Sequence, residues 1–219
     1  VELLRGEIME SFVTICLLIS TLMLFRLKKA VEAVGIIFVQ SLALALVSLI
    51  IWTKTGLLHL LIAGILTLCV KAILIPLVLY FTIKKTANKK RIDHSLGPVM
   101  SLFIAFLLVM IGQYIAAKLQ LPTAEHGAQY LATAITLIFL GIFKIINSKQ
   151  VLLQGIGVIV IENGLFLITQ AISYGMPMVV ELGIFFDLFV AVIIIASLSF
   201  KISSTFNSLN TEKMQDLRG

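Results

Sequence analysis

Three ionisable side chains lie in the middle of long apolar stretches, where a lipid bilayer does not tolerate an isolated charge. Glu162 is almost at the centre of one predicted span, and Lys71 is about one residue from the centre of another. Asp187 is about two residues, roughly 3 Å along a helix, from the centre of a third. A charge at this depth costs at least about 2.5–3.5 kcal/mol and usually faces a bundle interior or a wet cavity.

These two acids and one base allow two interpretations. Lys71 could form a buried structural ion pair with either Asp187 or Glu162. Alternatively, the three residues could relay protons or cations, because buried carboxyl groups and amines can exchange protons with their neighbours. Two acids and a base at one depth favour the relay.

Several polar residues near the same depth could support such a relay. Gln40 and Asn163 offer amide groups near the midplane, although such groups also hold helices together. Glu181, near the outer end of its span, could be an entry or exit group or an interfacial residue. Pro76 lacks an amide proton and should disturb the helix beside Lys71.

Four further residues are expected to serve helix packing or to reach the membrane surface. Gly155, Gly157 and Gly164 should let neighbouring helices approach closely. Lys144 is near enough to the end of its span for its ammonium group to reach the membrane surface.

The elements that position these residues must be membrane spans. Of the 219 residues, 60% are hydrophobic and 13% are charged, and the mean hydropathy is +1.11. Soluble domains are about 45–50% apolar and about 25% charged. A span needs roughly 20 apolar residues. The sequence therefore predicts an all-α integral membrane protein with seven transmembrane helices, at about residues 8–25, 33–53, 57–83, 98–117, 128–147, 151–172 and 178–200.

The distribution of basic residues predicts the orientation. Of the 17 Lys and Arg residues, Arg5, Lys54 and Lys118 fall on one side of the membrane and Lys71 falls inside a span. The other thirteen fall on the opposite side. By the positive-inside rule, the N-terminus faces outward and the C-terminus faces the cytoplasm. The same rule accounts for the net charge of +6 without nucleic acid.

The chain also contains an internal repeat. A shift of 122 residues places 34–40 over 156–162, and each segment follows a basic break after a preceding span. With one helix between them, the two copies enter the membrane in the same direction. We therefore expect two parallel three-helix units, residues 1–97 and 125–219, separated by a connecting fourth helix and loop in residues 98–124.

Common catalytic and cofactor motifs are absent from the sequence. Cys16 and Cys69 form no CxxC pair for an iron–sulfur cluster. The three histidines lie near or beyond span ends, and no GxGxxG or P-loop pattern occurs. We expect no catalytic centre, metal or cofactor in this chain, so any redox chemistry belongs to another polypeptide.

The order of these features resembles two related families. Residues from His126 onward resemble the K-type subunit of respiratory complex I. Nearly the whole chain resembles component E of hydrogenase-4, found in membrane-bound nickel–iron hydrogenase and formate hydrogenlyase-type complexes. The residues that carry the resemblance are Lys71 with Leu74 and Pro76, Gly97-Pro98, Ile161-Glu162-Asn163-Gly164, Val180-Glu181-Leu182-Gly183 with Asp187, and Leu209-Asn210 through Asp216-Leu217-Arg218-Gly219.

The resemblance implies a non-catalytic subunit in a prokaryotic cytoplasmic membrane, surrounded by phospholipid. Its direct neighbours would be antiporter-like subunits and a quinone-subunit-like anchor. Peripheral nickel–iron hydrogenase and iron–sulfur subunits would be indirect partners. The K-type subunit uses an acid in each of two helices, which correspond to Glu162 and, with a shorter side chain, Asp187.

Three hypotheses follow for the function. In the leading one, the chain helps to couple electron transfer elsewhere to proton or sodium movement, with Glu162, Asp187 and Lys71 in the pathway. In the second, it is a passive spacer or anchor in the same complex. In the third, it is an autonomous ion carrier, although its short loops and lack of a soluble domain favour burial among partners.

Overall fold

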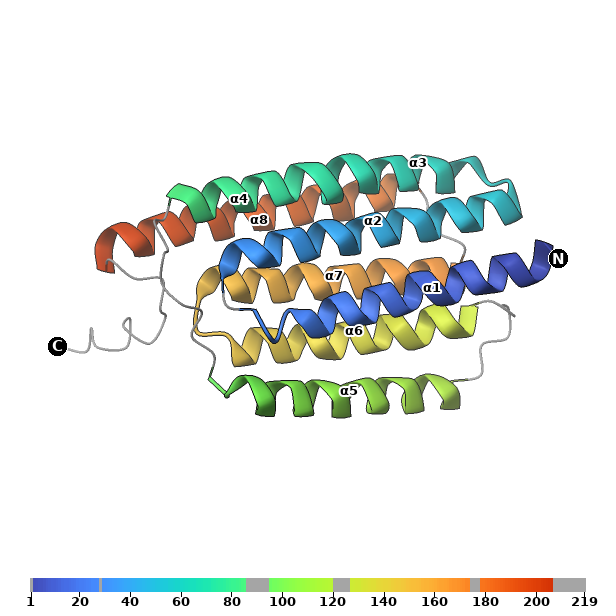
Figure 1. The fold of residues 1–219 in the computed structure, drawn as a ribbon. Coiled ribbons are helices and arrows are strands. Elements are labelled where there is room, and N and C mark those ends of the chain that lie inside the picture. Colours follow the sequence, from blue (N-terminus) through green and yellow to red (C-terminus); the bar gives the residue numbers. More distant parts are fainter. Residues whose placement is uncertain (1, 28, 86–94, 120–126, 174–177, 207–219) are drawn as a thin grey trace.

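The computed structural model describes residues 2–27, 29–85, 95–119, 127–173 and 178–206. All of the secondary-structure elements named for these residues are helices. The helices lie side by side with their long axes roughly aligned (Figure 1). They are α1 (Glu2–Met23), α2 (Ala30–Thr55), α3 (Leu58–Leu66), η1 (Thr67–Leu74), α4 (Ile75–Lys85), α5 (Pro98–Lys118), α6 (Gly127–Asn147), α7 (Val151–Ser173) and α8 (Met178–Phe206). The prediction of an all-helical chain is confirmed.

Within the described residues, five helices are long and apolar enough to cross a membrane. They are Ala30–Thr55, Leu58–Lys85, Pro98–Lys118, Ala128–Asn147 and Val151–Ile172, and Ile8–Met23 forms a shorter apolar helix. The second of these combines α3, η1 and α4 in one 28-residue rod, as expected for the predicted third span. A multi-pass membrane protein follows from these lengths and compositions.

Glycine and proline lie at the ends of helices where the chain changes direction. Gly56 adopts a left-handed conformation (φ 70°), and its amide donates to the carbonyl oxygen of Trp52 at the end of α2. Glycine adopts this conformation without the steric penalty that a Cβ imposes, so the chain can reverse into α3. Pro98 occupies the first turn of α5, where the missing amide proton costs no helical hydrogen bond.

Helices α6 and α7 pack with their backbones in contact. A methyl group on Gly157 would lie 2.9 Å from the Gly141 carbonyl oxygen, and one on Gly164 would lie 2.8 Å from that of Ala134. A methyl group on Gly155 would meet the side chain of Ile195 in α8 at 2.8 Å. The prediction that glycines on this helix permit close approach is confirmed, and α7 is thereby held between its neighbours.

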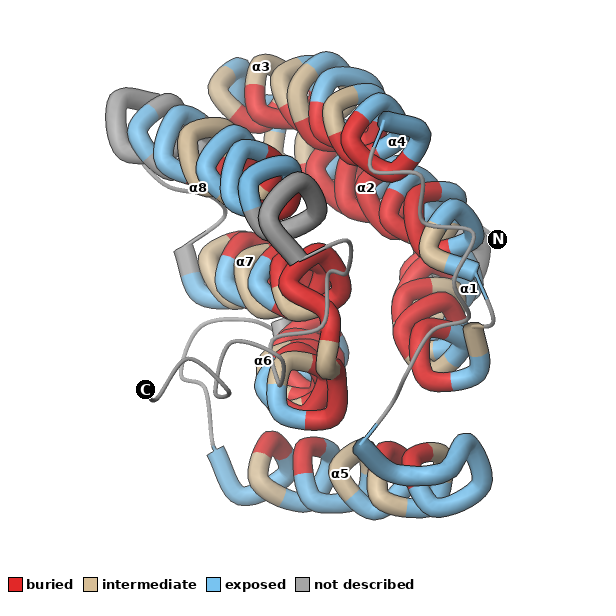
Figure 2. Tube along the Cα trace, turned by 90° about the vertical axis from the view of Figure 1, so that its left-hand side faces the viewer, coloured by how far each residue is buried: buried red, intermediate tan, exposed pale blue. Residues whose placement is uncertain are grey.

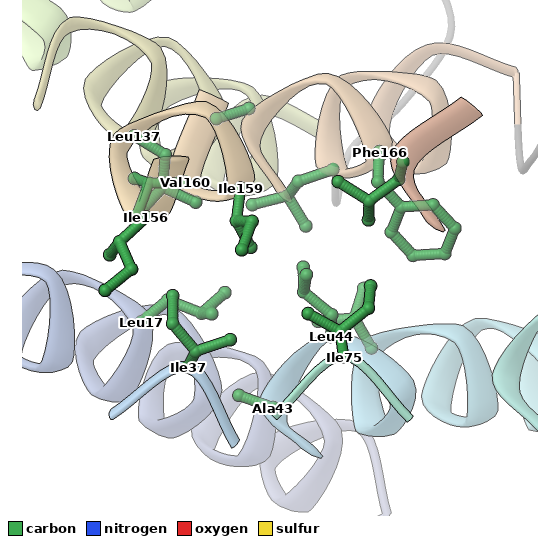
Figure 3. Close-up of a cluster of buried hydrophobic side chains, with 14 of the residues drawn as sticks. Leu17, Ile37, Ala43, Leu44, Ile75, Leu137, Ile156, Ile159, Val160 and Phe166 are labelled. Carbon is green, nitrogen blue, oxygen red and sulfur yellow. The ribbon is translucent and has the colours of Figure 1, made fainter. Parts of the chain in front are cut away.

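The apolar core lies between α7 on one side and α1, α2 and α4 on the other. In Figure 3, the α7 side chains face Leu17 of α1, Ile37 and Leu44 of α2, and Ile75 of α4. The labelled core residues of α7 are Ile156, Ile159, Val160 and Phe166. Exposed positions concentrate on α5 and on the described part of α8, at the edges of the bundle (Figure 2). The most enclosed part of the molecule is therefore the contact between α7 and the N-terminal helices.

Candidate ion-translocation site

Lys71 lies in a π-helical segment that interrupts the third rod. The amide of Ile75, at the end of this segment, donates to the carbonyl oxygen of Val70, five residues earlier. Pro76 follows and cannot donate to a carbonyl oxygen in the preceding turn. The wider turn therefore coincides with the disturbance that the proline predicts. π-helical turns are rare and occur frequently at functional sites.

The Lys71 ammonium group meets three side chains of α7. Its Nζ atom lies 2.5 Å from Oε2 of Glu162 and donates a hydrogen bond of 3.2 Å to Oδ1 of Asn163. Nζ also lies 4.8 Å from the centre of the Phe166 ring. The Lys71 side chain is 1% exposed and that of Glu162 is 12% exposed. The sequence left open whether Lys71 pairs with Asp187 or with Glu162, and in the structure it pairs with Glu162.

Further hydrogen bonds extend from this pair across the bundle. Asn163 donates through Nδ2 to Oε1 of Gln40 at 3.3 Å, and Gln40 donates through Nε2 to Oγ1 of Thr21 at 2.7 Å. Thr21 in turn donates to the carbonyl oxygen of Leu17 in its own helix at 2.7 Å. Asn163, Gln40 and Thr21 are all buried. We call the set Glu162, Lys71, Asn163, Gln40 and Thr21 the polar chain; it joins η1, α7, α2 and α1.

The position of the ion pair shapes its electrostatics. Removing two charges from water costs several kcal/mol per ion, and their mutual attraction offsets that cost only while both charges remain. Although Oε2 is close to Nζ, neither Glu162 oxygen has a well-oriented hydrogen-bond partner among the described residues. The described contact that holds the carboxylate is its ion pair with Lys71. Such a pair can be altered by moving a proton on or off either partner.

Asp187 is exposed on the surface of the bundle, on α8. An open groove of about 240 Å³ between α7 and α8 is lined by Val158, Glu162, Asp187, Leu188 and Ala191. Asp187 is exposed in the groove, whereas the Glu162 carboxylate oxygens lie beneath its surface. The two acids thus border one groove, and Glu162 belongs to the polar chain. The side chain of Glu181 lies outside the described residues.

A second ion pair, which the sequence did not indicate, joins α1 to α2. Glu10 is buried and pairs with Lys54 of α2, whose side chain is 34% exposed. Tyr130 of α6 is buried beside Glu10. Glu10 is the third residue of the predicted span at 8–25, too close to its start for its depth to single it out.

The prediction for Lys144 was wrong. Its side chain is 1% exposed, and Nζ donates to the carbonyl oxygen of Leu24 at 2.7 Å instead of reaching the surface. The seven-residue spacing of Tyr130, Leu137 and Lys144 places all three on one helix face, and all three are buried. That spacing could have revealed which way Lys144 points.

Possible metal ligands do not gather anywhere in the described part of the chain, where no three His, Cys, Asp or Glu side chains lie close enough to hold an ion.

Comparison with known proteins finds several relatives of this chain. The chain is similar to hydrogenase-4 component E of Escherichia coli (strain K12), with 28% identity over 149 residues, which cover 68% of this chain and 69% of that protein. Hydrogenase-4 component E of Shigella flexneri gives the same values. An uncharacterized protein of Mycobacterium tuberculosis is 24% identical over 182 residues, 82% of each chain. No family model and no solved structure matches.

Proposed function

We propose that this chain is a non-catalytic membrane subunit of a hydrogenase-4-like, complex I-related complex, in which it contributes buried charges to proton or sodium translocation coupled to electron transfer. The similarity to hydrogenase-4 component E supports membership in a hydrogenase complex. The resemblance of the C-terminal part to the complex I K-type subunit supports the coupling role and stays a prediction.

The observation that carries this proposal is the Lys71–Glu162 pair in its setting. A bundle that needed only to be held together would be served by apolar packing, since replacing a buried ion pair with apolar residues is often neutral or stabilising. Here the pair lies at a π-helical turn and continues into an amide and hydroxyl chain. Lys71 and Glu162 would change their protonation or pairing as the complex turns over.

Asp187 would connect this pair to a neighbouring subunit. Its carboxylate is exposed on α8 beside Glu162, and an exposed charge at midplane depth is unfavourable against acyl chains. Antiporter-like subunits and a quinone-subunit-like anchor are the proposed neighbours in the membrane, with the hydrogenase and iron–sulfur subunits farther away. Glu181, Asn163 and Gln40 would provide secondary relay or support.

The proposed topology is that expected from the sequence. Seven spans would place the N-terminus outside a prokaryotic cytoplasmic membrane and the C-terminus in the cytoplasm. Residues 1–97 and 125–219 would form parallel three-helix units, and residues 98–124 would connect them. Cysteine labelling of loop residues in intact cells, with a membrane-impermeant maleimide, tests this orientation.

The decisive experiment replaces Glu162 with Gln in the intact complex. Membrane vesicles carrying Glu162→Gln should evolve or consume hydrogen with fewer ions translocated per electron, because the amide cannot hold the negative charge that pairs with Lys71. Glu32→Gln is the matched control, since Glu32 is exposed near the start of α2. Unchanged pumping per electron in an assembled Glu162→Gln complex would remove Glu162 from the pathway and favour the passive spacer.

A further inference from the structure

Helices α6, α7 and α8 lie beside the earlier helices of the chain in matching order. Helix α1 packs on α6, α2 packs on α7, and α4 packs on α8. The two helices of each pair run in the same direction along the bundle (Figure 1). We call α1, α2 and the rod α3–η1–α4 the first row, and α6, α7 and α8 the second row. The end view in Figure 2 shows these rows side by side, so a sideways shift relates one to the other.

Charged and amide side chains join the two rows near the middle of the bundle. Lys71 of the first row pairs with Glu162 of the second, and Gln40 of the first row accepts a hydrogen bond from Asn163 of the second. Rows related by a sideways shift meet head to tail, and such a contact leaves one face of the last row free. The far face of the second row is therefore the counterpart of the face with which the first row binds it.

The internal repeat of the sequence relates the polar residues of the two rows. The shift of 122 residues places Gln40 over Glu162, and a shift of 116 residues places Lys71 over Asp187. Lys71 and Asp187 thus hold corresponding positions in the third helix of each row, but their charges are opposite. Lys71 takes an acid from the row beside it. By the same geometry, Asp187 would take a base from whatever lies against the second row.

The surface formed by α7 and α8 has the shape and composition of a docking face. Exposed apolar residues recur every seven positions along α7, at Val158, Leu165 and Ile172. In α8, Asp187 and Ile194 are also seven residues apart, and both are exposed. The groove of about 240 Å³ lies between these helices and is lined by Val158 and Asp187. It offers room for the end of a long side chain beside the Asp187 carboxylate.

The described residues of this chain do not supply a base for Asp187. The ion pairs among them are Lys54–Glu10 and Lys71–Glu162. The exposed basic residues that the structure describes all lie outside the predicted spans: Arg26, Lys29, Lys54, Lys84, Lys85, Lys118 and Lys201. A second copy of this chain stacked on the same face would therefore bring none of them to the depth of Asp187. Acyl chains would leave the carboxylate against hydrocarbon, which is unfavourable.

We propose that this face of α7 and α8 binds a transmembrane helix of a different subunit, and that a Lys or Arg side chain of that helix enters the groove and pairs with Asp187. The proposal rests on the proposed function, because it takes this chain to be one subunit of a complex. Two acids and two bases then lie together, with Lys71 as the inner base and the partner's side chain as the outer one. The charges of the site balance only when the partner is bound.

Cross-linking in membranes that contain the whole complex tests the identity of the partner. Benzoylphenylalanine, a photoreactive residue, in place of Leu165 should link to another subunit, in an apolar span that carries Lys or Arg within about two helical turns of the linked residue. The same photoreactive residue in place of Phe103, which is exposed on α5, should not link to that span. Links to lipid alone, to a second copy of this chain, or to a span without such a base would overturn the proposal.

Two variants of Asp187 test the role of its charge. Asp187→Asn leaves the partner's base without a counter-charge, so co-purification of the linked subunit in mild detergent should fall about tenfold, whereas Asp187→Glu should retain it. Unchanged co-purification with Asp187→Asn would overturn the proposal. Glu162→Gln measured in parallel separates the two proposals. If it keeps the linked subunit and translocates normally, the proposed function fails; if it loses translocation while Asp187→Asn keeps the linked subunit, only the docking proposal fails.

Discussion

Removing one partner of the Lys71–Glu162 pair should destabilise the protein much more than removing both. At 2.5 Å and an effective dielectric constant of about 20, two unit charges attract by about 7 kcal/mol. In the intact pair, the cost of desolvating the two charges offsets most of this attraction. When one charge is left alone, its desolvation cost remains and no attraction offsets it. Lys71→Met leaves a buried carboxylate without its counter-charge, and Glu162→Gln leaves a buried ammonium group without its counter-charge.

The magnitudes form a closed cycle. Each single variant should lose about 3–5 kcal/mol, the usual cost of breaking a buried pair, whereas the double variant should differ from the wild type by about 1 kcal/mol. The resulting coupling energy of roughly 7 kcal/mol agrees with the Coulomb value above. For a chain of 219 residues, the single variants should melt about 6–20 °C lower.

The assay heats the solubilised protein as a fluorescent fusion and measures, by size-exclusion chromatography, the fraction that stays monodisperse. Glu32→Gln serves again as the control, because Glu32 is exposed and glutamine can keep its contact with the Lys29 amide, so the melting temperature should stay unchanged. A double variant whose loss equals the sum of the two single losses would show that Lys71 and Glu162 are energetically independent, and the assignment of this pair as the centre of the site would then be wrong.

The remaining predictions concern packing and the other polar contacts. Gly157→Val should prevent accumulation of the folded protein because any side chain there meets the α6 backbone, whereas Gly35→Ala, with open space around it, should accumulate normally on immunoblots. Gln40→Leu should lower stability by about 1–3 kcal/mol, because two buried partners lose their hydrogen bond; an unchanged melting temperature would argue against the polar chain. Glu10→Gln and Lys54→Met should each cost about 1 kcal/mol, less than the deeper pair, because Lys54 is partly exposed; a cost as large as that of Lys71→Met would contradict this ranking.

Much of the helical framework could be predicted from the sequence, because a bilayer imposes one simple rule on composition and length. The apolar runs at 98–117 and 128–147 agree within one residue with α5 (Pro98–Lys118) and α6 (Gly127–Asn147). Lys71 drew attention because its charge conflicts with its depth, and Pro76 predicted the irregular helix beside it. Both signals depend on single residues and need no knowledge of neighbouring helices.

The partners of these residues could not be predicted in the same way. Glu162 and Asp187 lie at similar depths, and the choice between them as partner for Lys71 depends on how α7 and α8 are rotated about their axes. Thr21 stands in an apolar run, where a threonine hydroxyl usually bonds a carbonyl of its own helix. It does so here, and it also accepts from Gln40. Lys144 stands near a span end, where length alone allows it to reach water, but the rotation of α6 turns it inward.

The π-helical segment also bears on insertions and deletions in this part of the gene. A wide turn holds one more residue than the α-helical turn it replaces, so Thr67–Leu74 contains a surplus residue. Losing one residue elsewhere in the bundle would rotate everything downstream by about 100° and turn core faces toward lipid. A deletion inside Thr67–Leu74 would instead be absorbed as the turn tightens, so that the rest of the rod keeps its orientation. Shorter homologous sequences aligned at this point would be expected to carry an uninterrupted α-helix here, without the widened turn that surrounds Lys71.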